Sequence, residues 1–312
     1  MRAILIALLR ILVVAGCLVY LVSRAADGRV SSSLMAPLGL VAALVANQIA
    51  LTLFAVRMRA VLSLIDVNLS FKDAIRIHLQ SMFFFFVVPM TVGLDLARFI
   101  KIKSLAPEAD RLKLGGALVF DRLVGAGSAL LIALVLLAFM PLPLVAPSPL
   151  WGLAALGAAA FAVFAAHAMP RFRRATAGGL ALIRERPGRL FGIVAVSVAM
   201  HVTSAIAILL AAAAFGITID LFQTLFAVCG GIILMVVPVG FGGFGPADAG
   251  ATGLLVLLGQ PSGVAVTVAA LIFAARLIGG LEGGIWEIAD SGVEAITRFR
   301  TDPAARQDTA AP

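Results

Sequence analysis

Charged residues are scarce in this chain, and their scarcity limits what the protein can be. Only 13% of the 312 residues are charged, whereas 62% are hydrophobic, and the mean hydropathy is +1.10. A soluble domain does not carry so much apolar surface, so the composition predicts a polytopic membrane protein. The apolar runs are too long and too continuous for barrel strands, so we expect an all-α fold.

Cysteine and histidine are also rare, with two and three residues respectively. Cys17 and Cys229 both lie in apolar runs and are predicted to be packing residues rather than a disulfide or a metal site. His78, His167 and His201 are far apart in the sequence, without the spacing of metal ligands. We interpret His78 and His167 as interfacial, whereas His201 lies inside a span and is either functional or locally hydrogen-bonded. No metal and no cofactor is expected.

Enzyme signatures are missing from the sequence. It contains no nucleotide-binding P-loop, no His/Cys cluster and no Ser-His-Asp set. The glycine-rich residues 240–245 do not follow a βαβ pattern, so they are not a dinucleotide fingerprint. The sequence therefore favours a protein that is not an enzyme.

The net charge of +8 does not indicate nucleic acid. The basic residues gather in loops between apolar runs, where they determine orientation by the positive-inside rule. No basic stretch is interleaved with aromatic residues of the kind that stack on bases. We therefore expect cytoplasmic basic loops and no nucleic-acid partner.

Six apolar runs are predicted to cross the membrane. Arg10 interrupts the first of them and leaves an apolar core too short for a signal peptide, so we expect an uncleaved span. The charge-free connection 140–149 suits the external face, and the arginine-rich segment 171–189 suits the cytoplasmic surface. The predicted spans are 4–22, 34–56, 114–139, 150–168, 190–215 and 264–288.

Two further apolar runs end in clusters of proline and glycine, which break helices. Backbone without helical hydrogen bonds must be buried in protein or line a wet cavity, so paired breaks in the two halves of a membrane protein indicate a transport site. The predicted breaks contain Pro89 and Gly93 in the first copy, and Pro238, Gly242, Gly243 and Gly245 in the second.

Loop charges predict that each break is the tip of a re-entrant helical hairpin. The first hairpin, from residue 78 onward, has basic residues on both sides, so it enters from the cytoplasm; the second enters from outside. Each half, 1–140 and 150–288, then has three crossings and one hairpin, and the odd number of crossings makes the halves an inverted repeat. This predicts a transmembrane domain over 1–290, a disordered cytoplasmic tail over 291–312 and a cytoplasmic N-terminus.

Ionisable residues near the breaks are the candidate site, because such residues are costly in a membrane and usually face a cavity or a partner. Arginine offers a planar fork that matches phosphate oxygens. The other interpretation is that the acids and arginines around the first break are internal ion pairs that hold the first hairpin on the third span. Arg276 is the strongest functional candidate, since no acid of its own span is placed to neutralise it. The candidate substrate-binding residues are Asp95, Arg98, Asp121, Arg122, Asp248 and Arg276.

The phenylalanine run 83–86 in the first hairpin has two interpretations. It either contacts the acyl or isoprenoid tail of a lipid, or it is an ordinary packing or lipid-facing cluster. Composition does not separate these alternatives.

These same residues resemble the lysylphosphatidylglycerol synthase transmembrane family, also called the flippase-like domain family. Its P-x-x-x-G-G-D-x-x-R element is similar to the stretch from Pro89 to Arg98, and its acid–arginine pair to Asp121-Arg122. Its P-x-x-x-G-G-x-G-x-x-E element is similar to 238–248, and Arg276 matches an arginine of the last span. The resemblance extends over roughly 1–290.

The sequence departs from this family at two positions and in one domain. Leu94 stands where the first element has its second glycine, and Asp248 stands where glutamate is usual. We also expect no C-terminal aminoacyl-transferase domain of the kind that the full synthases carry. The resemblance therefore implies the lipid-translocating part of such proteins rather than aminoacylation.

Together, these features lead to three functional hypotheses. The first is a lipid flippase of the bacterial inner membrane, whose partner is a phospholipid or an isoprenoid lipid. The second is a non-catalytic scaffold that holds a cytoplasmic lipid-modifying enzyme through 171–189. The third is an intramembrane enzyme that acts on lipid headgroups, with paired acids as general acid and base.

Overall fold

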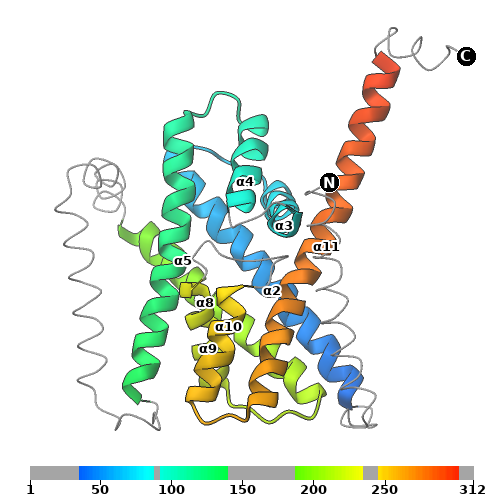
Figure 1. Ribbon diagram of the computed structural model, residues 1–312. Coiled ribbons are helices and arrows are strands. Elements are labelled where there is room, and N and C mark those ends of the chain that lie inside the picture. Colours follow the sequence, from blue (N-terminus) through cyan, green and yellow to red (C-terminus); the bar gives the residue numbers. More distant parts are fainter. Residues whose placement is uncertain (1–34, 88–91, 140–186, 235–244, 302–312) are drawn as a thin grey trace, which may run out of the picture.

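Helices account for the regular structure in the computed structural model of this chain (Figure 1). It describes residues 35–87, 92–139, 187–234 and 245–301, and no strand occurs in these ranges. The predicted all-α class is confirmed to that extent. The predicted spans 4–22 and 150–168, the connection 140–149 and most of both breaks lie outside the described residues.

Four of the described helices are long and apolar enough to cross a membrane. They match four of the six predicted spans, and they establish a helical membrane protein. These helices are α2 (Met35–Leu62), α5 (Arg111–Phe139), α8 (Pro187–Ala214) and α11 (Ser262–Thr301).

Two pairs of shorter helices lie on either side of the predicted breaks. The pair around the first break is α3 (Phe71–Val87) and α4 (Val92–Leu105). The pair around the second break is α9 (Leu221–Leu234) and α10 (Pro246–Leu257). The two members of each pair contact each other.

The helices of the two halves exchange contacts. The most extensive contact joins α2 to α8, which run together through the centre of the molecule (Figure 1). Helix α3 packs against α11, and α9 packs against α5, so the first arm of each pair contacts the last helix of the other half. The α3–α4 pair lies toward one end of the molecule and the α9–α10 pair toward the other (Figure 1).

The connection between α2 and α3 is a tight turn. Asp66 adopts a left-handed conformation with φ 61°, which aspartate tolerates better than most residues. The Ser70 hydroxyl accepts a hydrogen bond from the Asp73 backbone N–H at 3.1 Å, and α3 begins at the next residue. Ser70 therefore caps α3.

Glycines end α8 and α10. Gly216 and Gly259 have φ of 71° and 85°, a conformation that glycine adopts without a steric penalty. After each glycine, the next backbone N–H reaches back to a helical carbonyl, from Ile217 to Ala212 and from Gln260 to Leu255, both at 2.9–3.0 Å. This hydrogen-bond pattern terminates both helices.

Two helix ends differ from the prediction. Helix α2 continues to Leu62 rather than ending near residue 56, so Arg57 and Arg59 belong to a helix rather than a loop. Helix α11 continues to Thr301, through the start of the segment predicted as a disordered tail. No proline interrupts this extension before Pro303, and neither polar composition nor loop charge excludes a helix.

The phenylalanines of α3 pack against glycines of α11. Phe83 lies over Gly284 and Phe86 over Gly280, where an added Cβ would come within 2.6 Å of the Phe86 ring. Phe86 also meets Phe273 edge to face at 6.0 Å between ring centroids. These contacts support the packing interpretation for these two residues, whereas contact with a lipid tail remains an untested expectation.

Candidate functional site

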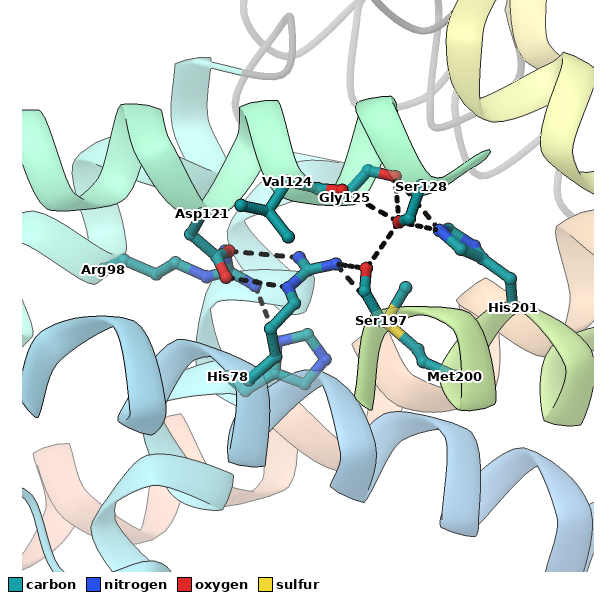
Figure 2. A network of polar contacts seen from close by, with 10 residues as sticks. His78, Arg98, Asp121, Val124, Gly125, Ser128, Ser197, Met200 and His201 are labelled. Atoms are coloured by element: carbon teal, nitrogen blue, oxygen red, sulfur yellow. Dashed lines mark hydrogen bonds and ion pairs between the residues drawn. The ribbon is translucent and has the colours of Figure 1, made fainter. Parts of the chain in front are cut away.

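Asp121 of α5 is the centre of a buried polar network that five helices share (Figure 2). Its carboxylate accepts hydrogen bonds from two arginines, and its side chain is only 1% exposed. Buried carboxylates are stable only when paired, so this convergence holds the helices in a defined arrangement. The five helices are α2, α3, α4, α5 and α8.

Arg57 of α2 is the main partner of Asp121. Its Nε and Nη2 atoms donate to the two carboxylate oxygens at 2.8 and 3.1 Å, which is the two-pronged geometry that arginine favours. Its Nη1 atom donates to the Ser197 hydroxyl of α8 at 3.0 Å. Arg57 follows the predicted span 34–56 directly, which would place it in a basic loop, whereas the structure buries its guanidinium between helices.

Arg98 of α4 is the second partner of Asp121, and its contact is longer. Nη1 lies 3.4 Å from the carboxylate, while Nε donates to the Ser81 hydroxyl at 3.3 Å. Nη2 lies 2.7 Å from His78 Nδ1. Arg98 and Asp121 were predicted as candidate residues from different segments, and the structure places them in contact.

His78 was predicted at the membrane interface, and the structure shows that its side chain faces other helices rather than the surface. Its side chain is buried, with its ring stacked on Phe54 of α2 at 5.2 Å between centroids. The sequence placed it at the start of an apolar run, and nothing local indicated the guanidinium that arrives from α4. Only the packing of α3 on α4 brings His78 to Arg98.

His201 of α8 extends the network on its other side, and its hydrogen-bond partners lie on another helix, α5. Its Nε2 atom donates to the Gly125 carbonyl of α5 at 3.0 Å. Ser128 lies 3.2 Å from the same nitrogen and 2.7 Å from Ser197 (Figure 2). These contacts join α5 to α8 through uncharged groups.

Asp95 and Arg122 form a separate ion pair between α4 and α5. Asp95 lies in the first turn of α4, where the helix dipole favours a negative charge. The two side chains are 31% and 39% exposed, so solvent screens this pair more than the buried network. The structure therefore contains the ion pairs between the first hairpin and the third span that the second interpretation predicts.

Asp248 and Arg276 form a third ion pair, between α10 and α11. Asp248 is fully buried in the first turn of α10, and its Oδ2 atom accepts the Gly245 backbone N–H at 3.0 Å. The acid partner of Arg276 comes from α10, the helix that follows the second predicted break. The pair therefore joins α10 to α11.

The predicted break residues are only partly described. Gly93 is buried in the first turn of α4, and Gly245 immediately precedes α10. Pro89, Pro238, Gly242 and Gly243 lie outside the described residues. Within the described ranges, no three His, Cys, Asp or Glu side chains are placed to hold a metal ion together, and the arrangement offers guanidinium donors for an anion instead.

Comparison with known proteins gives one result. The model of the family described as "Lysylphosphatidylglycerol synthase TM region" matches residues 7–281, which is most of the chain. No curated protein and no solved structure matches.

Proposed function

Because this chain belongs to the lysylphosphatidylglycerol synthase TM region family, we propose that it is a lipid flippase of the bacterial inner membrane. Its cargo would be the headgroup of an anionic, polyprenyl or hopanoid-type lipid, which passes through a polar site at mid-membrane while the tail stays in the lipid. Family and apolar helices together make it a membrane protein related to lipids.

One repeated arrangement supports this proposal most directly. In each half, an aspartate in the first turn after the break pairs with an arginine of the last helix of that half. The pairs are Asp95 with Arg122 and Asp248 with Arg276. Charged residues in membrane helices are costly, so their appearance at equivalent places in two halves indicates a role beyond packing.

The helix contacts support an inverted repeat. The pairing of α3 with α11 and of α9 with α5 relates the two halves reciprocally, and the hairpins lie toward opposite ends (Figure 1). Two re-entrant hairpins entering from opposite faces fit this arrangement. Transport would then proceed by movement of one half against the other around the charged residues, with both termini in the cytoplasm.

In this mechanism the arginines have the direct role. Arg98, Arg122 and Arg276 would exchange their aspartate partners for headgroup phosphate, because a guanidinium binds either group through the same fork. The aspartates would hold the arginines in position between transport events. An ion pair therefore supports the transport proposal rather than contradicting it.

The test is transbilayer movement in vesicles. The full chain is reconstituted into liposomes with fluorescent phosphatidylglycerol, polyprenyl phosphate or hopanoid, and the outward fraction is measured by a membrane-impermeable quencher. The proposal expects faster movement of at least one of these lipids than in protein-free vesicles. No acceleration of any lipid by folded protein would overturn it.

Two variants distinguish function from structure at the second pair. Asp248→Asn leaves Arg276 partly buried without a charged partner, so both stability and transport should fall. The double variant with Arg276→Gln removes both charges and should recover much of the stability but not the transport. Full transport by the folded double variant would remove this pair from the mechanism.

A further inference from the structure

Arg98 and the charged side chains around it carry a net charge of one positive unit. The charged side chains that act on Arg98 are two aspartates, Asp95 and Asp121, and two further arginines, Arg57 and Arg122. Three arginines therefore face two aspartates among the described residues. Asp95 neutralises Arg122, and Arg57 with Arg98 share Asp121. A buried surplus charge is unfavourable unless an anion compensates it.

His78 contributes an unused hydrogen-bond donor at the same place. Arginine only donates, so the 2.7 Å contact from Arg98 Nη2 requires His78 Nδ1 to accept. The ring is then neutral, and its proton lies on Nε2. That nitrogen is buried and has no hydrogen-bond partner among the described residues, although the side chain is only 2% exposed. A buried donor of this kind calls for an acceptor.

Arg98 is the arginine that can change partners. Arg57 contacts both carboxylate oxygens of Asp121 at 2.8 and 3.1 Å, whereas Arg98 contacts one oxygen at 3.4 Å. If Arg98 turned toward a ligand, Asp121 would keep two hydrogen bonds from Arg57. The network could therefore release Arg98 without leaving a buried carboxylate unpaired.

His201 shows why the unused nitrogen of His78 is informative. Its unpartnered nitrogen is Nδ1, while Nε2 donates to the Gly125 carbonyl. The free position of His201 is therefore an acceptor, which repels an anion, whereas that of His78 is a donor. Surplus positive charge and an unused donor coincide only at the Arg98 end of the network.

We infer that Arg98 and His78 form a subsite for one singly charged oxyanion, with the Arg57–Asp121 pair as its fixed support. This inference rests on the proposed function for the source of the oxyanion, which is the phosphodiester of a lipid headgroup. A phosphodiester carries a single negative charge at neutral pH and so matches the surplus. Arg98 would bind it through its fork, and His78 Nε2 would donate one further hydrogen bond.

Binding is tested by thermal unfolding of the purified full chain in a neutral detergent. Short-chain phosphatidylglycerol is titrated in one series, short-chain diacylglycerol, which lacks the phosphate, in a second, and inorganic phosphate in a third. The expected result is a saturable rise in Tm with phosphatidylglycerol alone. A similar rise with diacylglycerol would overturn the subsite, and a similar rise with inorganic phosphate would overturn the lipid headgroup as its occupant.

Three variants locate the effect. Arg98→Gln removes the surplus charge, and His78→Phe removes the donor while keeping a ring that stacks on Phe54. Each should raise the half-saturating phosphatidylglycerol concentration at least tenfold. Lys113→Gln removes one positive charge from an exposed position of α5 and should leave the half-saturating phosphatidylglycerol concentration unchanged. If Arg98→Gln fails to fold, the binding measured with His78→Phe alone tests the subsite, because this variant leaves the Arg57–Asp121 pair intact.

The outcomes separate this subsite from the proposed transport. If both Arg98→Gln and His78→Phe bind phosphatidylglycerol as the wild type does, the subsite is overturned. The transport proposal, which is tested separately by lipid movement in vesicles, would still stand. Binding that depends on both residues, from protein that moves no lipid in vesicles, would uphold the subsite and overturn transport.

Discussion

Gly125 of α5 leaves the space in which the Arg57 guanidinium lies. An added Cβ would come within 2.7 Å of Arg57 Nη1, which is held by Ser197 and lies beside the Asp121 contact. A buried arginine with three fixed hydrogen bonds cannot move aside without losing some of them. The polar network therefore requires a residue without a Cβ at position 125.

We predict that Gly125→Ala lowers the free energy of unfolding by about 1–3 kcal/mol, as overpacking does in other well-packed interiors. The measurement is thermal unfolding in detergent micelles. Gly127→Ala is the matched control, because a Cβ at this position of the same helix meets nothing within 4 Å. Equal stability of the two variants would show that Arg57 is not held where the structure places it.

The ion pairs at Asp121 and Asp95 should differ strongly in strength. Asp121→Asn leaves two buried arginines without a carboxylate, and breaking such a pair costs about 3–5 kcal/mol. Asp95→Asn breaks a pair whose side chains are 31% and 39% exposed, which costs about 0–1 kcal/mol. Unfolding of both variants under the same conditions measures the difference. A larger loss for Asp95→Asn would contradict the burial of the network.

At the scale of helices, α3 and α11 approach each other closely because α11 presents glycines. A Cβ added at Gly283 would overlap the backbone carbonyl of Leu79, and one at Gly284 would come within 3.0 Å of the Phe83 ring. Backbone cannot rotate away as a side chain can. Glycine at position 283 therefore sets the distance between the first arm of one hairpin and the last helix of the other half.

We predict that Gly283→Ala pushes α3 away from α11 and lowers stability by about 1–3 kcal/mol. The measurement combines thermal unfolding with the distance between spin labels on the two helices. Gly253→Ala in α10 serves as the control, since a Cβ there meets nothing within 4 Å. An unchanged distance with unchanged stability would refute the close packing.

At the scale of the whole molecule, the proposed inverted repeat predicts on which side each loop lies. The connection between α10 and α11 should be external, and the basic connection between α4 and α5 should be cytoplasmic. Figure 1 shows these two connections at opposite ends of the molecule. Ser262 and Glu108 are exposed positions at these two sites.

Single cysteines test this orientation in intact cells with a membrane-impermeable maleimide. With Cys17 and Cys229 replaced by serine, Ser262→Cys should react from outside, and Glu108→Cys only after the membrane is opened. The unmodified cysteine-free chain measures the background. Reaction of both positions from the same side would reject the inverted repeat while leaving the helix contacts as they are.

Local features of the sequence were sufficient to predict where the four long helices lie. Long apolar runs placed α2, α5, α8 and α11, and α8 and α10 each end at a glycine, Gly216 and Gly259. These are properties of neighbouring residues, since helix length and helix termination depend on hydrogen bonds within a few positions. The charge of a residue did not reveal a helix end, so Arg57 was assigned to a loop although α2 continues through it.

The sequence by itself determined an all-α membrane protein with two interrupted helical segments and a small set of charged residues beside them. Only the tertiary structure decided which of these charges meet. Asp121 lies 64 residues from Arg57 along the chain, and it reaches Arg98 only because α4 packs beside α5. Composition shows that a buried charge needs a partner, but the identity of that partner follows from the packing of helices that are distant in sequence.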